Sequence, residues 1–309
     1  MCYLQQQFSS DASSIVAADR ATHATYATYD GPYDPSAAGY TSCVPGPLAP
    51  IDFERTWVNA IHAAGLHAWF RQTWNTWKGL YGERVLTYST SPQIPYETSG
   101  GVNAVLSGVD SNSYLARTYR FIIGHPELFA NGDIFTPQSE PDGAGIGCSK
   151  CQFPSTSEYN RFLRDSMAVD RMAFADLGRN VTVGMWGVSC TQLILDSTTV
   201  SQMGVVSTDC YMRSAAQLAS ALAGIHATYG VPVAVGEWGD IWDQAQQPAL
   251  NNELNAVMSV LSSAPYVVGV NYWQAIGGPG GEGLVDPANL QLNSAGGAVG
   301  AWYSGWPAR

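Results

Sequence analysis

Two glutamates in this chain each follow a short apolar run directly, which is where chemistry-bearing residues of parallel-strand proteins gather. Glu140 ends the run 133–139 and is followed by Pro141, which cannot continue a strand ladder. Glu237 ends the run 232–236. A carboxylic acid and a carboxylate facing one another can cleave a glycosidic bond, because one protonates the leaving oxygen while the other attacks the anomeric carbon. The alternative is that each glutamate only caps a helix or pairs with an arginine.

The elements around these glutamates alternate between short apolar runs and amphipathic stretches, which predicts parallel βα units. We expect strands at 22–29, 66–70, 133–136, 181–186, 205–207, 232–236 and 267–273. Helices are expected at 4–18, 53–64, 114–129, 157–177, 215–229, 250–262 and 298–306, with a long loop at 73–111.

This order predicts an α/β fold, a (β/α)₈ TIM barrel whose first strand is short or absent. Either residues 2–4 supply a rudimentary strand or the barrel lacks one. We expect residues 1–309 to form a single catalytic barrel domain. The glutamates then lie on strands four and seven, across the barrel mouth from one another.

Composition narrows the kind of ligand. Only 13% of the 309 residues are charged, the net charge is −11, and the pI is near 4.7. Lys and Arg form no cluster, which argues against nucleic acid and anionic membranes as partners. No apolar run reaches the length of a membrane span. A surface of low charge favours a neutral ligand, so we expect an oligosaccharide or polysaccharide substrate and a monomeric protein.

Cysteine usage indicates an exported protein. Of the six cysteines, Cys148 and Cys151 form one CxxC without a second pair, so a local loop disulfide is favoured over a zinc site. The five histidines show no metal-binding spacing, and we expect no metal and no cofactor. No signal peptide is recognised at the start of the sequence; a mature fragment, or a gene start assigned too late, would look like this. We expect secretion to the extracellular space.

Three short motifs resemble those of the clan A glycoside hydrolases, retaining (β/α)₈-barrel glycosidases, with a family 5-like enzyme as the nearest match. They are Ser139-Glu140-Pro141, Gly236-Glu237-Trp238 and Asn271-Tyr272-Trp273, and their order covers most of the chain. The resemblance implies a double displacement, with Glu140 as acid/base and Glu237 as nucleophile. It also implies that Tyr211 hydrogen-bonds the nucleophile and that Trp273 forms the floor of the −1 sugar site.

One position departs from that pattern. Many clan A enzymes have Asn directly before the acid/base, where it contacts the sugar 2-hydroxyl, and here the residue is Ser139. Serine is shorter, so that contact passes through water or comes from elsewhere. The departure leaves the exact family and the −1 sugar open.

Further candidate substrate-binding residues follow the predicted strands. Arg71 either keeps a carboxylate ionised or bonds a sugar hydroxyl, and its alternative is a structural ion pair. Asp30 either binds a sugar hydroxyl or shapes the Asp-Gly-Pro turn. Flat aromatic rings can stack on the apolar face of a sugar, and their alternative is core packing. We expect such platforms from Trp74, Trp186 and Trp238.

The leading hypothesis is a retaining enzyme that cleaves β-linked neutral polysaccharide within the chain, with β-glucan, mannan and xylan all possible. The alternative is a catalytically silent barrel that binds glycans; it would keep the tryptophans but lose a carboxylate. An aldolase would require a lysine at a strand end, and a metal-dependent amidohydrolase would require clustered histidines. Neither pattern is found in the sequence.

Overall fold

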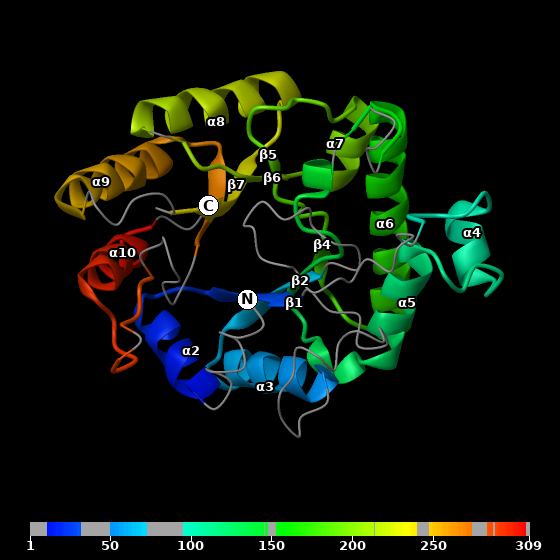
Figure 1. Ribbon diagram of the computed structural model, residues 1–309, viewed down its shortest axis with the longest axis horizontal. Coiled ribbons are helices and arrows are strands. Elements are labelled where there is room, and N and C mark those ends of the chain that lie inside the picture. Colours follow the sequence, from blue (N-terminus) through cyan, green and yellow to red (C-terminus); the bar gives the residue numbers. More distant parts are fainter. Residues whose placement is uncertain are drawn as a thin grey trace.

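The computed structural model of the chain describes residues 11–31, 50–72, 95–144, 146–147, 153–212, 214–239, 247–273, 283–286 and 288–306 (Figure 1). At 29–31, 50, 53, 144 and 247–253 it describes the backbone alone. Short strands lie at the centre of the molecule, and helices surround them (Figure 1).

All strand pairs are parallel and fall into two four-stranded sheets, ordered β1-β2-β3-β4 and β5-β6-β7-β8. Because parallel strands end at the same edge, residues at their carboxyl ends gather at one mouth. The strands are β1 (Tyr26–Gly31), β2 (His67–Gln72), β3 (Ile134–Thr136), β4 (Thr182–Val183), β5 (Val188–Ser189), β6 (Val206–Asp209), β7 (Val233–Trp238) and β8 (Val267–Tyr272).

The helices form the outer layer, and several begin at side-chain caps. Ser113, Ser155, Asp196, Ser214 and Asn293 each accept a hydrogen bond from a backbone N–H in the first turn that follows. The helices are α2 (Ala12–Ala21), α3 (Pro50–Ala63), α4 (Gly101–Leu106), α5 (Tyr114–Gly124), α6 (Thr156–Asp176), α7 (Ser197–Met203), α8 (Ala215–Tyr229), α9 (Gln247–Ser263) and α10 (Ser294–Ser304), with 3-10 turns at Pro126–Leu128 and Pro141–Ala144.

The core lies between the strands and the helix layer. Phe70 of β2 and Phe135 of β3 stack with ring centroids 5.9 Å apart, and Phe174 of α6 packs against Phe135 at 5.6 Å. Every residue of β2 except His67 is buried, which is the pattern of a strand covered on both faces. The strands are thereby fixed from outside, and their ends can hold polar residues in defined positions.

One predicted strand is divided in two. We expected a single strand at 181–186, but β4 ends at Val183 and β5 begins at Val188. Gly184 and Gly187 between them have φ of 96° and 65°, a left-handed backbone that ends the ladder. The break leaves β4 paired with β3 and β5 paired with β6.

Two short helices were not predicted. Helix α4 lies within the segment expected to be loop, and α7 follows β5. Both are too short to show a clear helical period in the sequence. The first described strand is β1, which follows α2. Residues 2–4, where a rudimentary first strand was one of two alternatives, lie outside the described residues, and so do Cys148 and Cys151.

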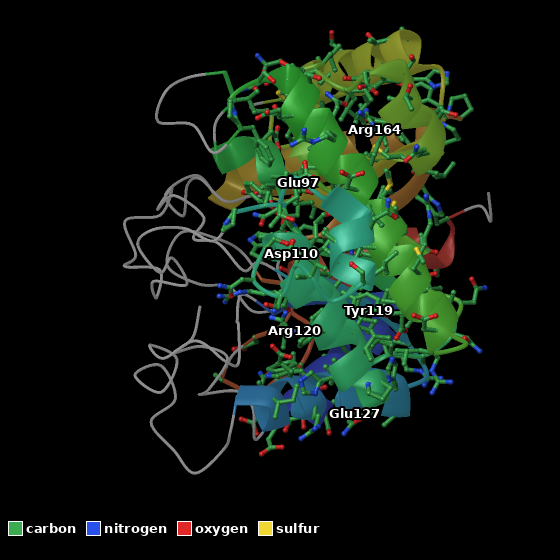
Figure 2. The ribbon with its side chains drawn as sticks, turned by 90° about the vertical axis from the view of Figure 1, so that its right-hand side faces the viewer. Glu97, Asp110, Tyr119, Arg120, Glu127 and Arg164 are labelled. Atoms are coloured by element: carbon green, nitrogen blue, oxygen red, sulfur yellow. A yellow bond between two sulfur atoms is a disulfide. The ribbon has the colours of Figure 1, made fainter. Side chains whose placement is uncertain are left out.

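Helices α4, α5 and α6 make up one outer flank, which carries charged and polar side chains (Figure 2). Arg164 of α6 pairs with Asp196 at 2.6 Å, and Tyr119 of α5 donates to Asp176 at 3.0 Å. None of the helices in the described ranges is long and apolar enough to cross a membrane.

Candidate active site

Three carboxylates from three different elements meet at the mouth. Glu140 follows β3, Asp209 is the last residue of β6, and Glu237 is the second-to-last residue of β7. One oxygen from each lies within 4.8 Å of one oxygen of the other two. An oxygen–oxygen separation of at most 4.8 Å between Glu140 and Glu237 is below the roughly 6.5–9.5 Å of inverting glycosidases and nearer the roughly 5–5.5 Å of retaining ones.

Glu140 is held by an unusual backbone. Its φ is 45°, in the left-handed region that residues with a side chain rarely adopt. Its N–H donates to the carbonyl of Trp186 at 2.9 Å, and its own carbonyl accepts from Gly143 at 3.0 Å. Such strain is kept where surrounding contacts fix the conformation, and it is commonest at functional sites. The result is a partly exposed carboxyl directed by the loop rather than by the strand.

Glu237 is 8% exposed and receives two donors. The Arg71 guanidinium donates through Nη1 to Oε1, and the Tyr211 hydroxyl donates to Oε2 at 2.7 Å. Asn271 of β8 donates to the carbonyl of Gly236 at 3.0 Å, which fixes the backbone one residue before the carboxylate. Both oxygens of Glu237 are therefore oriented, as an attacking carboxylate requires.

Arg71 links the site together. Its side chain is 2% exposed, and it binds Glu237, Asp209 and the Ser139 hydroxyl. The bond from Nη2 to Oδ2 of Asp209 is 2.8 Å long. Contact with a carboxylate, one of the two roles expected of Arg71, is therefore present in the structure. Ser139 accepts from Arg71 through its oxygen, so its own hydroxyl hydrogen stays available for donation.

Tyr211 stays protonated in this setting. Burial raises the pKa of its phenol, and the negative charge of Glu237 raises it further. The hydroxyl therefore keeps its proton near neutral pH and donates it to Glu237. This is the contact that the resemblance implied.

Asp209 was not assigned by sequence reasoning. Burial raises the pKa of its carboxyl well above the usual range; Arg71 opposes that rise, and the charges of Glu237 and Glu140 add to it. The signal available was its place at the end of a strand, two residues before Tyr211. That signal is weak because strand ends in any barrel carry polar residues.

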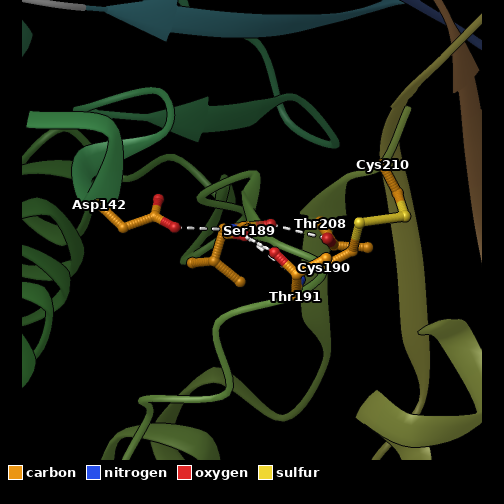
Figure 3. Close-up of a disulfide and its surroundings, with 7 residues drawn as sticks. Asp142, Ser189, Cys190, Thr191, Thr208 and Cys210 are labelled. Atoms are coloured by element: carbon orange, nitrogen blue, oxygen red, sulfur yellow. Dashed lines mark hydrogen bonds between the residues drawn. A yellow bond between two sulfur atoms is a disulfide. The ribbon is translucent and has the colours of Figure 1, made fainter. Parts of the chain in front are cut away.

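A disulfide braces the β5 and β6 ends beside the site. Cys190 and Cys210 are bonded with their Cα atoms 5.5 Å apart (Figure 3), and in the sequence Cys210 lies between Asp209 and Tyr211. The N–H of Ser189, next to Cys190, donates to Asp142 at 2.8 Å (Figure 3). The loop after Glu140 is thus tied to β5, and the disulfide connects the residue after β5 to the segment that carries Tyr211.

Two of the expected tryptophan platforms are wrong. Trp186 is 0% exposed and lies 6.0 Å from Phe162 of α6. Trp238 is 2% exposed and packs edge-on against Trp302 of α10. Both rings fill the layer between strands and helices, where no sugar can stack on them. Trp186 lies between β4 and β5 and Trp238 is the last residue of β7, and each ring contacts an aromatic residue of the helix layer.

The remaining predicted residues are placed in part. Trp273 directly follows β8 and is partly exposed, so its role as a sugar floor stays a prediction. The backbone of Asp30 pairs with Arg71 at the end of β1 and β2, while its side chain is outside the described set. Trp74 lies outside the described residues altogether.

Among the described residues, these three carboxylates lie close enough together to share a cation. Arg71 already donates to two of them, and a cation placed between those two would face its positive charge. The donor set therefore fits acid–base and nucleophilic chemistry better than metal binding.

No family model and no curated protein sequence matches the chain. Solved structures do resemble it. The exo-beta-1,4-mannosidase from Opitutaceae bacterium strain TAV5 has a TM-score of 0.63 and 13% identity over 95% of this chain. This chain covers 55% of that protein, so it spans little more than half its length.

Two further structures match over more of their length. GH5_18 from Streptomyces cattleya, in complex with GlcNAc, has a TM-score of 0.67 and 14% identity, covering 97% of this chain and 76% of that one. The family 5 xyloglucanase from Paenibacillus pabuli has a TM-score of 0.61 and 13% identity, covering 95% and 89%.

At these identities the likeness shows the fold. It is the (β/α)₈-barrel fold of these glycoside hydrolases, and the fold prediction is confirmed.

Proposed function

We propose that this protein is a retaining β-glycosidase, with Glu140 as general acid/base and Glu237 as nucleophile. The proposal rests above all on the approach of the Glu140 and Glu237 carboxylates to within 4.8 Å at the mouth of a clan A barrel. Arg71 and Tyr211 both donate to Glu237, which suits a nucleophile that must be ionised and fixed.

The mechanism has two steps. First Glu140 gives its proton to the leaving oxygen while Glu237 attacks the anomeric carbon, forming a covalent glycosyl ester. Then Glu140, now ionised, takes a proton from water, and that water displaces Glu237 with overall retention. Arg71 and Tyr211 stabilise the Glu237 carboxylate before attack and when it leaves.

For the substrate we propose a neutral β-linked polysaccharide cleaved within the chain. The low charge of the sequence favours a neutral ligand. The structural neighbours include an exo-acting mannosidase, an endoglucanase and a xyloglucanase, so β-glucan, mannan and xylan are all test substrates. We further propose that the protein is secreted, which the Cys190–Cys210 disulfide supports.

The test is a screen of purified protein on these polysaccharides and on aryl β-glycosides, beside Glu140→Gln and Glu237→Gln. We expect hydrolysis by the wild type and loss in both variants, with viscosity falling faster than reducing ends appear. A protein that binds glycans but gives wild-type and variant rates at the blank level is a silent barrel. Release of single sugars without loss of viscosity contradicts endo action.

A further inference from the structure

Asp209 is a third carboxylate in a site whose chemistry needs two. Its side chain is 1% exposed. Oδ2 accepts from Arg71, whereas Oδ1 is buried with no hydrogen-bond donor among the described residues. A buried carboxylate oxygen without a donor is costly, and a proton on the carboxyl removes most of that cost.

Ionising Asp209 together with the carboxylates around it would cost electrostatic free energy. The groups that face it are Arg71 from β2, Glu237 from β7, Glu140 after β3 and Tyr211 after β6. Tyr211 is neutral, so one guanidinium would have to balance as many as three carboxylates. When carboxylates share a site in this way, one of them keeps its proton.

Asp209 is built into this position by its neighbours. A Cβ on Gly187 would lie 2.5 Å from its Oδ2, and a Cβ on Gly236 would lie 2.6 Å from its Oδ1. Gly236 directly precedes Glu237, and its φ is not left-handed. Glycine is therefore required at this position because a side chain would not fit, and not because of the backbone conformation. The Asp209 carboxyl also lies within hydrogen-bonding reach of Glu237. The backbone of β7 is thus shaped to bring these two carboxyls together.

We propose that Asp209 is a positioning residue that works as a neutral carboxylic acid, donating its hydrogen bond to Glu237 and accepting one from Arg71. This proposal rests on the glycosidase function proposed above. A neutral Asp209 leaves the positive charge of Arg71 to Glu237 and adds a third donor to the nucleophile. The direction of its pKa shift, upward through burial, agrees with this role.

Its protonation can be measured without turnover. The infrared difference spectrum between wild type and Asp209→Asn, recorded near neutral pH, should contain the carbonyl stretch of a protonated carboxylic acid. Asp170→Asn is the matched control, because Asp170 is also fully buried, with a raised pKa, but lies on α6 away from the site. It should remove a similar band. If Asp209→Asn does not fold, Asp209→Ser gives the same comparison in the space beside the two glycines.

Kinetics provide the second arm. Asn keeps the shape and the neutral donor, so kcat of Asp209→Asn should stay within about threefold of wild type. Asp209→Ala should lose on the order of 10²-fold in kcat, the cost of misplacing a reacting group by about 1 Å. The alkaline limb of the pH profile of kcat should become shallower in Asp209→Asn and keep the wild-type shape in Asp170→Asn. A difference spectrum with carboxylate bands alone, or an Asn variant as slow as the Ala variant, overturns the proposal. If the wild type turns over no glycoside, the infrared arm still decides the protonation, so the two failures are distinct.

Discussion

The Tyr211 hydroxyl donates to Oε2 of Glu237 at 2.7 Å, while Arg71 donates to Oε1 of the same carboxylate. Each oxygen of Glu237 therefore has its own donor. The phenol reaches Glu237 from the residue after Cys210, whose disulfide fixes that segment. In the proposed mechanism, a donor so placed orients the attacking carboxylate and also assists its departure in the second step.

Tyr211→Phe should therefore slow catalysis without unfolding the protein. A hydrogen bond to a charged group is worth about 1.5–3 kcal/mol, so kcat/KM for an aryl glycoside should fall roughly 10- to 100-fold. Tyr229→Phe is the matched control, since the Tyr229 hydroxyl accepts from the N–H of Leu195 rather than donating to Glu237. It should lower the melting temperature slightly and keep kcat/KM. Equal kinetic losses in both variants would contradict the role of Tyr211.

The Cys190–Cys210 disulfide should matter for both stability and activity. It closes a loop with a sequence separation of 20, for which the chain-entropy account gives about 3 kcal/mol of unfolding free energy. The double variant Cys190→Ser, Cys210→Ser should unfold at correspondingly lower denaturant and lose kcat, because Cys210 lies between Asp209 and Tyr211. Mutation is preferred to reduction, which would act on every disulfide of the chain.

Equilibrium unfolding in urea and kcat well below the transition measure the two effects separately. A variant with wild-type stability contradicts the presence of the bond. A variant that is less stable but has wild-type kcat contradicts its role in fixing Tyr211.

The two glutamates could be predicted because their signal is local. A carboxylate after an apolar run is visible in the sequence, and parallel topology brings such ends together. The pairing of Cys190 with Cys210 could not be predicted, since it depends on β5 and β6 being neighbours in space. The fit of Asp209 between two glycines depends on contacts of residues far apart in sequence. Trp186 was misplaced because it was taken to stand at the end of a strand over 181–186, whereas the strand breaks at Gly184.

Asp19 on α2 should make stability depend on pH. Burial raises the pKa of its carboxyl from 3.8 to about 7. Below pH 4 the folded and unfolded states are both protonated at this group. Between about pH 4 and 7 the unfolded chain releases the proton first, so the folded state loses stability as pH rises. The loss is at most a few kcal/mol, at about 1.4 kcal/mol for each pKa unit.

Asp19→Asn should remove that slope. Below about pH 4 the unfolding free energies of this variant and the wild type, measured in urea, should change with pH in parallel. Between about pH 4 and pH 7 the variant should become increasingly more stable relative to the wild type. Asp11→Asn is the matched control at the start of the same helix, where the aspartate makes no side-chain cap bond. It should follow the wild-type pH trend. A constant difference between Asp19→Asn and wild type at every pH would rule out titration of Asp19 as the cause.

Azide should separate the roles of Glu140 and Glu237. An activated aryl β-glycoside has a leaving group that needs little protonation, so Glu140→Ala should still form the glycosyl ester and then stall for lack of a base. Azide needs no base, and it should restore turnover and give the β-glycosyl azide. Glu237→Ala should lose both steps, and azide should rescue it only with inversion, to the α-glycosyl azide.

Loss of either glutamate should cost at least the roughly 10²–10⁴-fold that general acid–base catalysis contributes. Glu127→Ala is the matched control, because Glu127 is an exposed glutamate that pairs with Arg55 on the outer surface. It should keep the wild-type rate and show no response to azide. Product configuration by proton NMR decides the assignment. A β-azide from Glu237→Ala with no azide response from Glu140→Ala would exchange the two roles, and wild-type rates in both variants would contradict a catalytic role for either glutamate.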